Sequence, residues 1–255
     1  MNKPIEKKQP FINAPLSVIV LCVLLLGVHL VVTQLGGADR NTLYVYGALF
    51  PARFFEAGLG GLPGDIWLGL VNLLTYNFLH GGWEHVILNT AWIFAFGTVV
   101  ARRLGGLGFL LLFFGSGIIG GFGQAYVTSN EAYLVPIIGG SASGAGLMGA
   151  ACRFAFSAKH KNAVWPEFPR PLSTIETLRQ PITLAFIAVW FGLNFLSGLL
   201  APLGLMTTDG SAINVGWVAH LFGFIGGFYL LVLLDPPPMS PSGGPGRVDY
   251  GDWRD

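Results

Sequence analysis

Charged residues are scarce in this 255-residue chain. Asp, Glu, Lys and Arg together make up 11% of the residues, whereas 53% are hydrophobic. A soluble domain carries about a quarter charged residues, because its surface must be hydrated. The scarcity of charge therefore excludes an ordinary soluble domain and indicates an integral membrane protein.

Cysteine is nearly absent as well. Cys22 and Cys152 lie in separate apolar runs and form neither a CxxC motif nor a metal-binding spacing, so we expect both to be small buried residues. H-E-x-x-H is missing, and the spacing from His80 to His85 is one residue too long for H-x-x-E-H. We therefore expect no metal site. The net charge is only +1 and no basic stripe is present, so nucleic acid is not an expected partner.

Long apolar runs make up most of the remaining sequence. A helix needs roughly 20 apolar residues to cross the hydrocarbon core of a bilayer. The expected fold class is an all-α membrane protein, a bundle of six transmembrane helices at about 15–35, 85–103, 106–127, 141–158, 182–202 and 213–234. The long first loop, residues 36–83, is itself amphipathic and is expected to lie at the membrane interface.

The distribution of Lys and Arg predicts the orientation. Of the 14 Lys and Arg residues, 12 fall on one face of the six-span topology, and only Arg40 and Arg53 fall on the other. The positive-inside rule then places both termini in the cytoplasm. We expect a cytoplasmic segment at 1–13, a membrane domain at 14–235 and a disordered, Pro/Gly/Ser-rich cytoplasmic tail at 236–255.

Strongly polar residues inside the expected spans form three clusters, and such residues suggest a functional site because they are costly in lipid. His80, His85 and Asn89 stand at the start of the second span, with the last two on one helix face. Ser141 and Ser143 begin the fourth span and lie on opposite faces if both are helical. Interhelical hydrogen bonding and hydroxyls bonded to backbone carbonyls are the structural alternatives.

The third cluster lies in the sixth span, where His220, Gly223 and Gly227 form one stripe. Glycines allow close approach of a neighbouring helix, so the histidine on that stripe is aimed at the neighbour. A serine hydroxyl needs a base to take its proton, and a tetrahedral intermediate needs hydrogen-bond donors. The three clusters could supply both. No aspartate lies in a span to orient the base, so a dyad is expected.

These residues resemble the rhomboid intramembrane serine proteases. The family pattern H-x-x-x-x-H-x-x-x-N is complete from His80 to Asn89, and A-H-x-x-G-x-x-x-G is complete from Ala219 to Gly227. A serine motif close to the family's G-x-S-G opens the fourth span. Six spans, a long first loop and cytoplasmic termini also agree, and the resemblance covers about residues 14–235.

The resemblance implies a serine endopeptidase that cleaves peptide bonds in or near transmembrane segments of membrane proteins, in the lipid bilayer and without a cofactor. The location implied is the bacterial inner (cell) membrane. Ser141 would be the nucleophile and His220 the base, with His85 and Asn89 supporting the oxyanion. Structural roles near the site would fall to His80, Gly139, Gly223 and Gly227.

The chain departs from the family pattern at two places. The family's loop motif Trp-Arg reads Val71-Asn72, so its arginine is missing. Ala142 follows the expected nucleophile where the family has glycine. Counted from Ser141, the later glycines of the family motif, five and eight positions on, fall on Gly146 and Gly149; counted from Ser143, they fall on Met and Ala. The register favours Ser141 as the nucleophile. Because of the two departures, the alternative function is that of a catalytically inactive relative that binds transmembrane clients.

Overall fold

The computed structural model describes residues 14–55, 61–128, 133–156, 171–200, 207–208, 211–212 and 216–235. Within them every regular element is a helix apart from a pair of two-residue strands. The elements are α1 (Leu16–Gln34), α2 (Gly37–Gly47), α3 (Ala52–Phe55), α4 (Ile66–Thr75), the 3₁₀ helix η2 (Tyr76–Phe78), α5 (Trp83–Val127), α6 (Ser141–Cys152), α7 (Thr174–Leu178), α8 (Pro181–Leu200), β1 (Thr207–Thr208), β2 (Ser211–Ala212) and α9 (Trp217–Leu234). The expected segments 1–13 and 236–255 lie outside the described residues.

Among the described helices, four are long and apolar enough to cross a membrane: α1, α5, α8 and α9. The 45-residue α5 is not straight, because Gly105 has a positive φ of 73° and interrupts the helical backbone. A Cβ on Gly97 would lie 2.9 Å from the Phe109 ring, a contact that residues 12 apart in a straight helix could not make. The two arms of α5 therefore fold against each other, at the expected spans 85–103 and 106–127.

The expected fourth span, 141–158, is too long at its C-terminal end. Helix α6 ends at Cys152, and Arg153 caps it. The Arg153 guanidinium is buried and donates to the carbonyl oxygens of Leu172 (2.8 Å) and Phe228 (3.0 Å). The Arg153 carbonyl oxygen accepts from the Leu172 N–H (2.8 Å) and not from a further turn of helix. With α6 at 12 residues, the count of six spans stays a prediction.

The first loop is folded into helices α2, α3, α4 and η2. Asp65 caps α4 by accepting hydrogen bonds from the N–H groups of Trp67 and Leu68. Trp67 and Leu70 of α4 are exposed, which fits a helix lying at a membrane interface. A β-bridge between Leu49 and Ile137 joins this loop to the segment that precedes α6.

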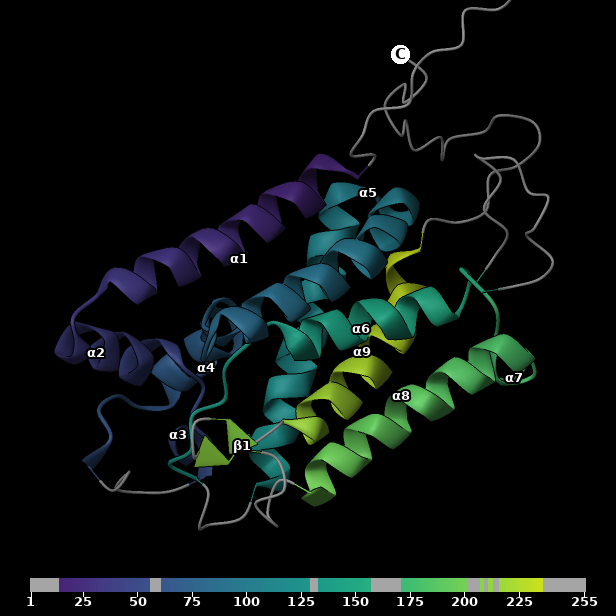
Figure 1. The fold of residues 1–255 in the computed structure, drawn as a ribbon. Coiled ribbons are helices and arrows are strands. Elements are labelled where there is room, and N and C mark those ends of the chain that lie inside the picture. The colour runs from purple at the N-terminus through teal and green to yellow at the C-terminus, as the bar shows by residue number, and fades with distance from the viewer. Residues whose placement is uncertain are drawn as a thin grey trace, which may run out of the picture.

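Helix α6 lies at the centre of the bundle between α5 and α9 (Figure 1). Every residue from Ala142 to Cys152 is buried, which is possible because most of them are Gly, Ala or Ser. Helix α8 lies at the edge beside α9 (Figure 1), and Thr183 is its only buried residue among those whose side chains are described. Both cysteines are free and buried, as expected.

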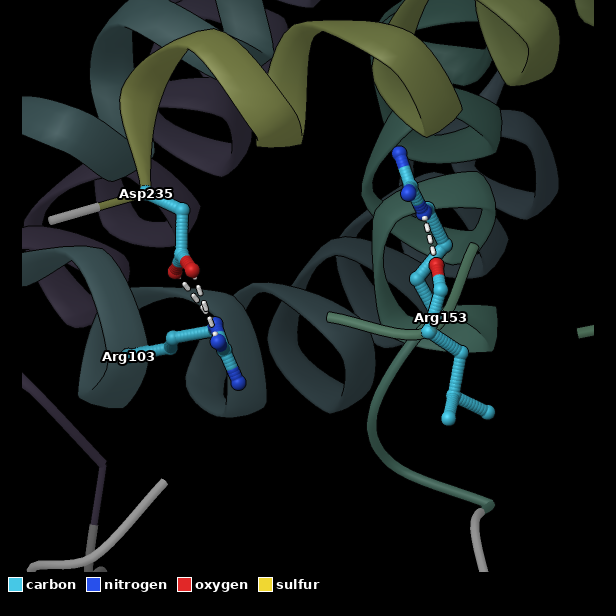
Figure 2. A network of polar contacts seen from close by, with 4 residues as sticks. Arg103, Arg153 and Asp235 are labelled. Carbon is cyan, nitrogen blue, oxygen red and sulfur yellow. Dashed lines mark hydrogen bonds and ion pairs between the residues drawn. The ribbon is translucent and has the colours of Figure 1, made fainter. Parts of the chain in front are cut away.

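The end of the bundle where α6 and α9 finish is closed by arginines (Figure 2). Arg103 lies beside the kink of α5 and pairs with Asp235 at the end of α9, with its Nη2 2.8 Å from the carboxylate. Arg153, at the end of α6, donates hydrogen bonds to the carbonyl oxygens of Leu172 and of Phe228 in α9. These contacts fix α5, α6 and α9 at one end, and the other ends of the same helices meet at the serine.

Candidate active site

Ser141 is the first residue of α6 and is half-buried, whereas the rest of the helix is buried. Gly139, two residues earlier, has a φ of 109° that favours glycine. The Gly139 N–H donates to the Tyr76 carbonyl oxygen (2.9 Å), which ties the turn to the first loop. Among the described residues, the Ser141 hydroxyl has no hydrogen-bond partner. The Ser141 side chain is therefore partly exposed at the end of the bundle where α6 begins, without a hydrogen-bond partner in the described part of the chain.

Ser143 faces the opposite way. It is fully buried, and its hydroxyl donates to the Asn77 Oδ1 at 2.6 Å. A Cβ on Gly117 of α5 would lie 2.3 Å from the Ser143 oxygen, so this side of α6 has no room for another molecule. The two serines thus point to opposite faces, as the helical geometry predicted.

Helices α6 and α9 touch through their backbones. A Cβ on Gly223 would lie 2.2 Å from the Ala142 carbonyl oxygen, and one on Gly227 would lie 2.0 Å from that of Gly146. The two contacts run in the same direction along both helices, so α6 and α9 are parallel where they cross. His220 lies one turn before Gly223 in α9, so the helix register puts its backbone near the level of Ser141. Among the described residues, no hydrogen bond joins the His220 ring to Ser141.

His85 and Asn89 meet the same turn from the first arm of α5. A Cβ on Gly139 would lie 2.7 Å from the His85 Nε2 and 3.2 Å from the Asn89 Nδ2. Asn89 is buried, and its Nδ2 has no hydrogen-bond partner. A buried amide donor without a partner is costly and uncommon. This donor lies beside the turn that presents Ser141.

His80 contacts the turn at Gly139 and Gly140 that precedes Ser141. Its Nδ1 lies 3.3 Å from the Phe78 carbonyl oxygen, and its Nε2 accepts from the Gly140 N–H at 3.5 Å. This pair of contacts requires a neutral ring. Burial, with a smaller contribution from the nearby His85, lowers the pKa of His80 to about 3, so the ring is neutral at physiological pH. His80 thus joins the first loop to the serine turn.

The expected oxyanion residues, Ser141 and Gly139 therefore gather at one end of the bundle, whereas Gly223 and Gly227 pack α9 against the length of α6. Sequence reasoning missed Asn194 of α8, whose Oδ1 lies 2.6 Å from the His220 Nδ1. The only signal for it was a lone amide in the apolar run 182–202. Nothing in the sequence pairs a residue of that run with the sixth span.

Sequence reasoning also missed Arg53. Its guanidinium is buried and donates to the carbonyl oxygens of Ala48, Val45 and Pro63 and, at 2.7 Å, to the Asn72 Oδ1. Asn72 stands where the family motif has arginine. The first loop therefore keeps a buried guanidinium, supplied from a position 19 residues earlier.

The arrangement offers a hydroxyl, an imidazole and amide donors around one accessible point, a combination suited to acyl transfer. A family model described as "Rhomboid domain" matches residues 68–236. A Bacillus subtilis (strain 168) protein named "Putative rhomboid protease YdcA" is 34% identical over 175 residues, which cover 69% of this chain and 70% of that protein. Residues 68–236 contain every site residue expected from the sequence, and this chain belongs to the rhomboid family.

Proposed function

We propose that this protein is an intramembrane serine endopeptidase that cleaves peptide bonds in or near transmembrane segments of membrane proteins. The observation that carries the proposal is the pairing of an accessible Ser141 with a buried, unpartnered Asn89 amide on either side of the same glycine turn. A hydroxyl with no acceptor and a donor with no ligand are what a site needs before a carbonyl group binds.

In the proposed reaction, His220 takes the proton of Ser141 while the serine oxygen attacks the scissile carbonyl carbon. Apo sites often lack the tight hydrogen bond between base and nucleophile, which forms when substrate binds. The C–N bond of the tetrahedral intermediate then breaks, and the leaving amine takes the proton from His220. Water, activated by the same histidine, hydrolyses the acyl-enzyme.

The oxyanion would receive three donors. The Ser141 N–H has no intrahelical partner, because it belongs to the first turn of α6. The Asn89 Nδ2 and the His85 Nε2 both lie against Gly139, two residues away. In mutagenesis of other proteases, each such donor is worth about 3–4 kcal/mol of transition-state stabilisation.

Ala142 does not obstruct this site. A Cβ on Gly120 would lie 2.7 Å from the Ala142 methyl, so the methyl occupies the space that Gly120 leaves open on α5. The oxyanion donors approach from the other arm of α5, at Gly139. The extra methyl relative to the family motif is accommodated by packing away from the serine turn.

The topology is part of the proposal. Six spans would comprise α1, the two arms of α5, α6, α8 and α9. Arg102, Arg103 and Arg153 lie at the end of the bundle away from Ser141. Under the positive-inside rule, that end and both termini would be cytoplasmic. The serine would then face the non-cytoplasmic surface of the bacterial inner membrane, from which water can reach it.

Labelling with a fluorophosphonate, which reacts with activated serines, tests the proposal. The purified protein, Ser141→Ala, Ser143→Ala and His220→Ala are compared in detergent, with size-exclusion profiles as the folding control. We expect the wild type and Ser143→Ala to label, Ser141→Ala to be silent, and His220→Ala to label at a small fraction of the wild-type rate because the base is gone.

Labelling that survives Ser141→Ala but vanishes with Ser143→Ala would overturn the assignment of the nucleophile. A folded wild-type protein that does not label would favour the alternative of an inactive relative that binds transmembrane clients. Cleavage of a reconstituted single-span substrate, blocked by Ser141→Ala, would extend the result from serine reactivity to proteolysis.

A further inference from the structure

Asn194 makes a second hydrogen bond besides the one to His220. Its Nδ2 donates to the carbonyl oxygen of Trp190, one turn earlier in α8, at 2.8 Å. This bond uses the donor side of the amide and leaves the Oδ1 facing α9. The Oδ1 then accepts from His220, so the direction of the interhelical bond is fixed.

The direction of that bond determines the tautomer of His220. A carbonyl oxygen can only accept, so the Nδ1 of His220 must carry the proton that it shares with Asn194. The neutral ring then has its proton on Nδ1 and its lone pair on Nε2. A lone pair on Nε2 is what a base needs to take a proton from Ser141.

The placement of this amide argues against an incidental contact. An amide inside an apolar span is unfavourable in lipid. Its neighbours Leu193, Phe195 and Leu196 are all exposed, as expected for a helix facing lipid, while Asn194 is half-buried against α9. Trp190, on the same face one turn earlier, stacks on Phe224 of α9, with ring centroids 5.2 Å apart. The aromatic contact holds the amide at the height of His220.

We propose that Asn194 is a positioning residue for catalysis. It fixes the ring orientation and the tautomer of His220 and so completes a Ser141–His220–Asn194 triad. This inference rests on the proposed function for its consequence in catalysis, but the tautomer itself is independent of activity. A neutral amide in the third position orients the imidazole without adding a charge to the membrane interior. The same solution, with cysteine as nucleophile, is found in papain-like proteases.

The test compares three variants of the full chain in detergent. Asn194→Leu has a similar volume but no acceptor, Asn194→Asp keeps an oxygen at the same place, and Leu196→Ala is the control on the lipid-facing side of α8. The first readout is the nitrogen NMR spectrum of ¹⁵N-histidine-labelled protein, in which the His220 signals are identified by their loss in His220→Asn. The second is the rate of fluorophosphonate labelling.

We expect wild type and Leu196→Ala to show the Nδ1–H tautomer, and Asn194→Leu to lose it. Labelling of Asn194→Leu should slow by about tenfold, the effect of one hydrogen bond of roughly 1.4 kcal/mol, and Asn194→Asp should recover part of that rate. An unchanged tautomer in a folded Asn194→Leu would overturn the inference. So would a labelling rate equal to that of the wild type. A wild type that shows the tautomer but never labels would refute the proposed function while leaving the orientation of His220 by Asn194 standing.

Discussion

Ser141 and Ser143 are two residues apart, yet Ser141 is half-buried without a hydrogen-bond partner among the described residues, and Ser143 is fully buried and bonded to Asn77. The spacing of later glycines predicted Ser141 as the nucleophile, and that assignment stays a prediction. The opposite orientation of the two side chains could be derived from helical geometry alone. The partner of Ser143 could not, because Asn77 lies 66 residues away on another element.

The hydrogen bond of Ser143 leads to a prediction on stability. Ser143→Ala should lower the free energy of unfolding by about 1–2 kcal/mol, because the buried Asn77 Oδ1 loses its donor. Ser141→Ala should change it by less than about 0.5 kcal/mol, because that side chain is half-exposed. Thermal unfolding of both variants in the same detergent measures the difference. A Ser141→Ala protein less stable than Ser143→Ala would contradict the environments described for the two serines.

At the scale of helices, apolar runs predicted the positions of α1, α8 and α9 to within a few residues. The end of α6 was missed, because the apolar run continues past Arg153 and the backbone partners of that arginine lie in distant segments. The close crossing of α6 and α9 was indicated by the glycine stripe. Which residue each glycine touches required the folded chain.

The crossing predicts a large difference between two glycines. Gly227→Ala places a methyl 2.0 Å from the Gly146 carbonyl oxygen, so the helices must separate, and we expect a loss of about 1–3 kcal/mol or failure to fold. Gly27→Ala, in α1, has no atom within 4 Å of its new methyl and should be neutral or slightly stabilising. Denaturation in detergent reports both. Equal stability of the two variants would show that α6 and α9 do not touch as described.

For the whole molecule, the sequence predicted an all-helical membrane protein with its candidate site residues at the starts of the second and fourth spans and in the sixth span. It did not predict how the first loop is held there. That loop is joined to the serine turn through Leu49, Tyr76 and His80, and it is itself held together by Arg53. A guanidinium bound by backbone carbonyls has no sequence signature, because every residue carries the acceptor.

Arg53 should therefore matter far beyond its own helix. Arg53→Met leaves several buried carbonyl oxygens without a donor, and each lost bond to a charged group costs about 1.5–3 kcal/mol. We expect loss of thermal stability and slower labelling of Ser141, because the loop supports the serine turn. Arg40→Met, which removes an exposed arginine bonded to the Leu35 carbonyl oxygen, is the matched control. Similar behaviour of the two variants would mean that the loop is held by other contacts.

The Arg53–Asn72 pair has a consequence for how related sequences are sorted. A survey that scores each position separately would count this chain among the degenerate members, since the residue at 72 is not arginine. Scored as a pair, the chain has a buried guanidinium, that of Arg53, bonded to the residue at the motif position, Asn72. Relatives with asparagine at the position of Asn72 and arginine at the position of Arg53 should be grouped with those that have the motif arginine. Relatives that lack both arginines form a separate group.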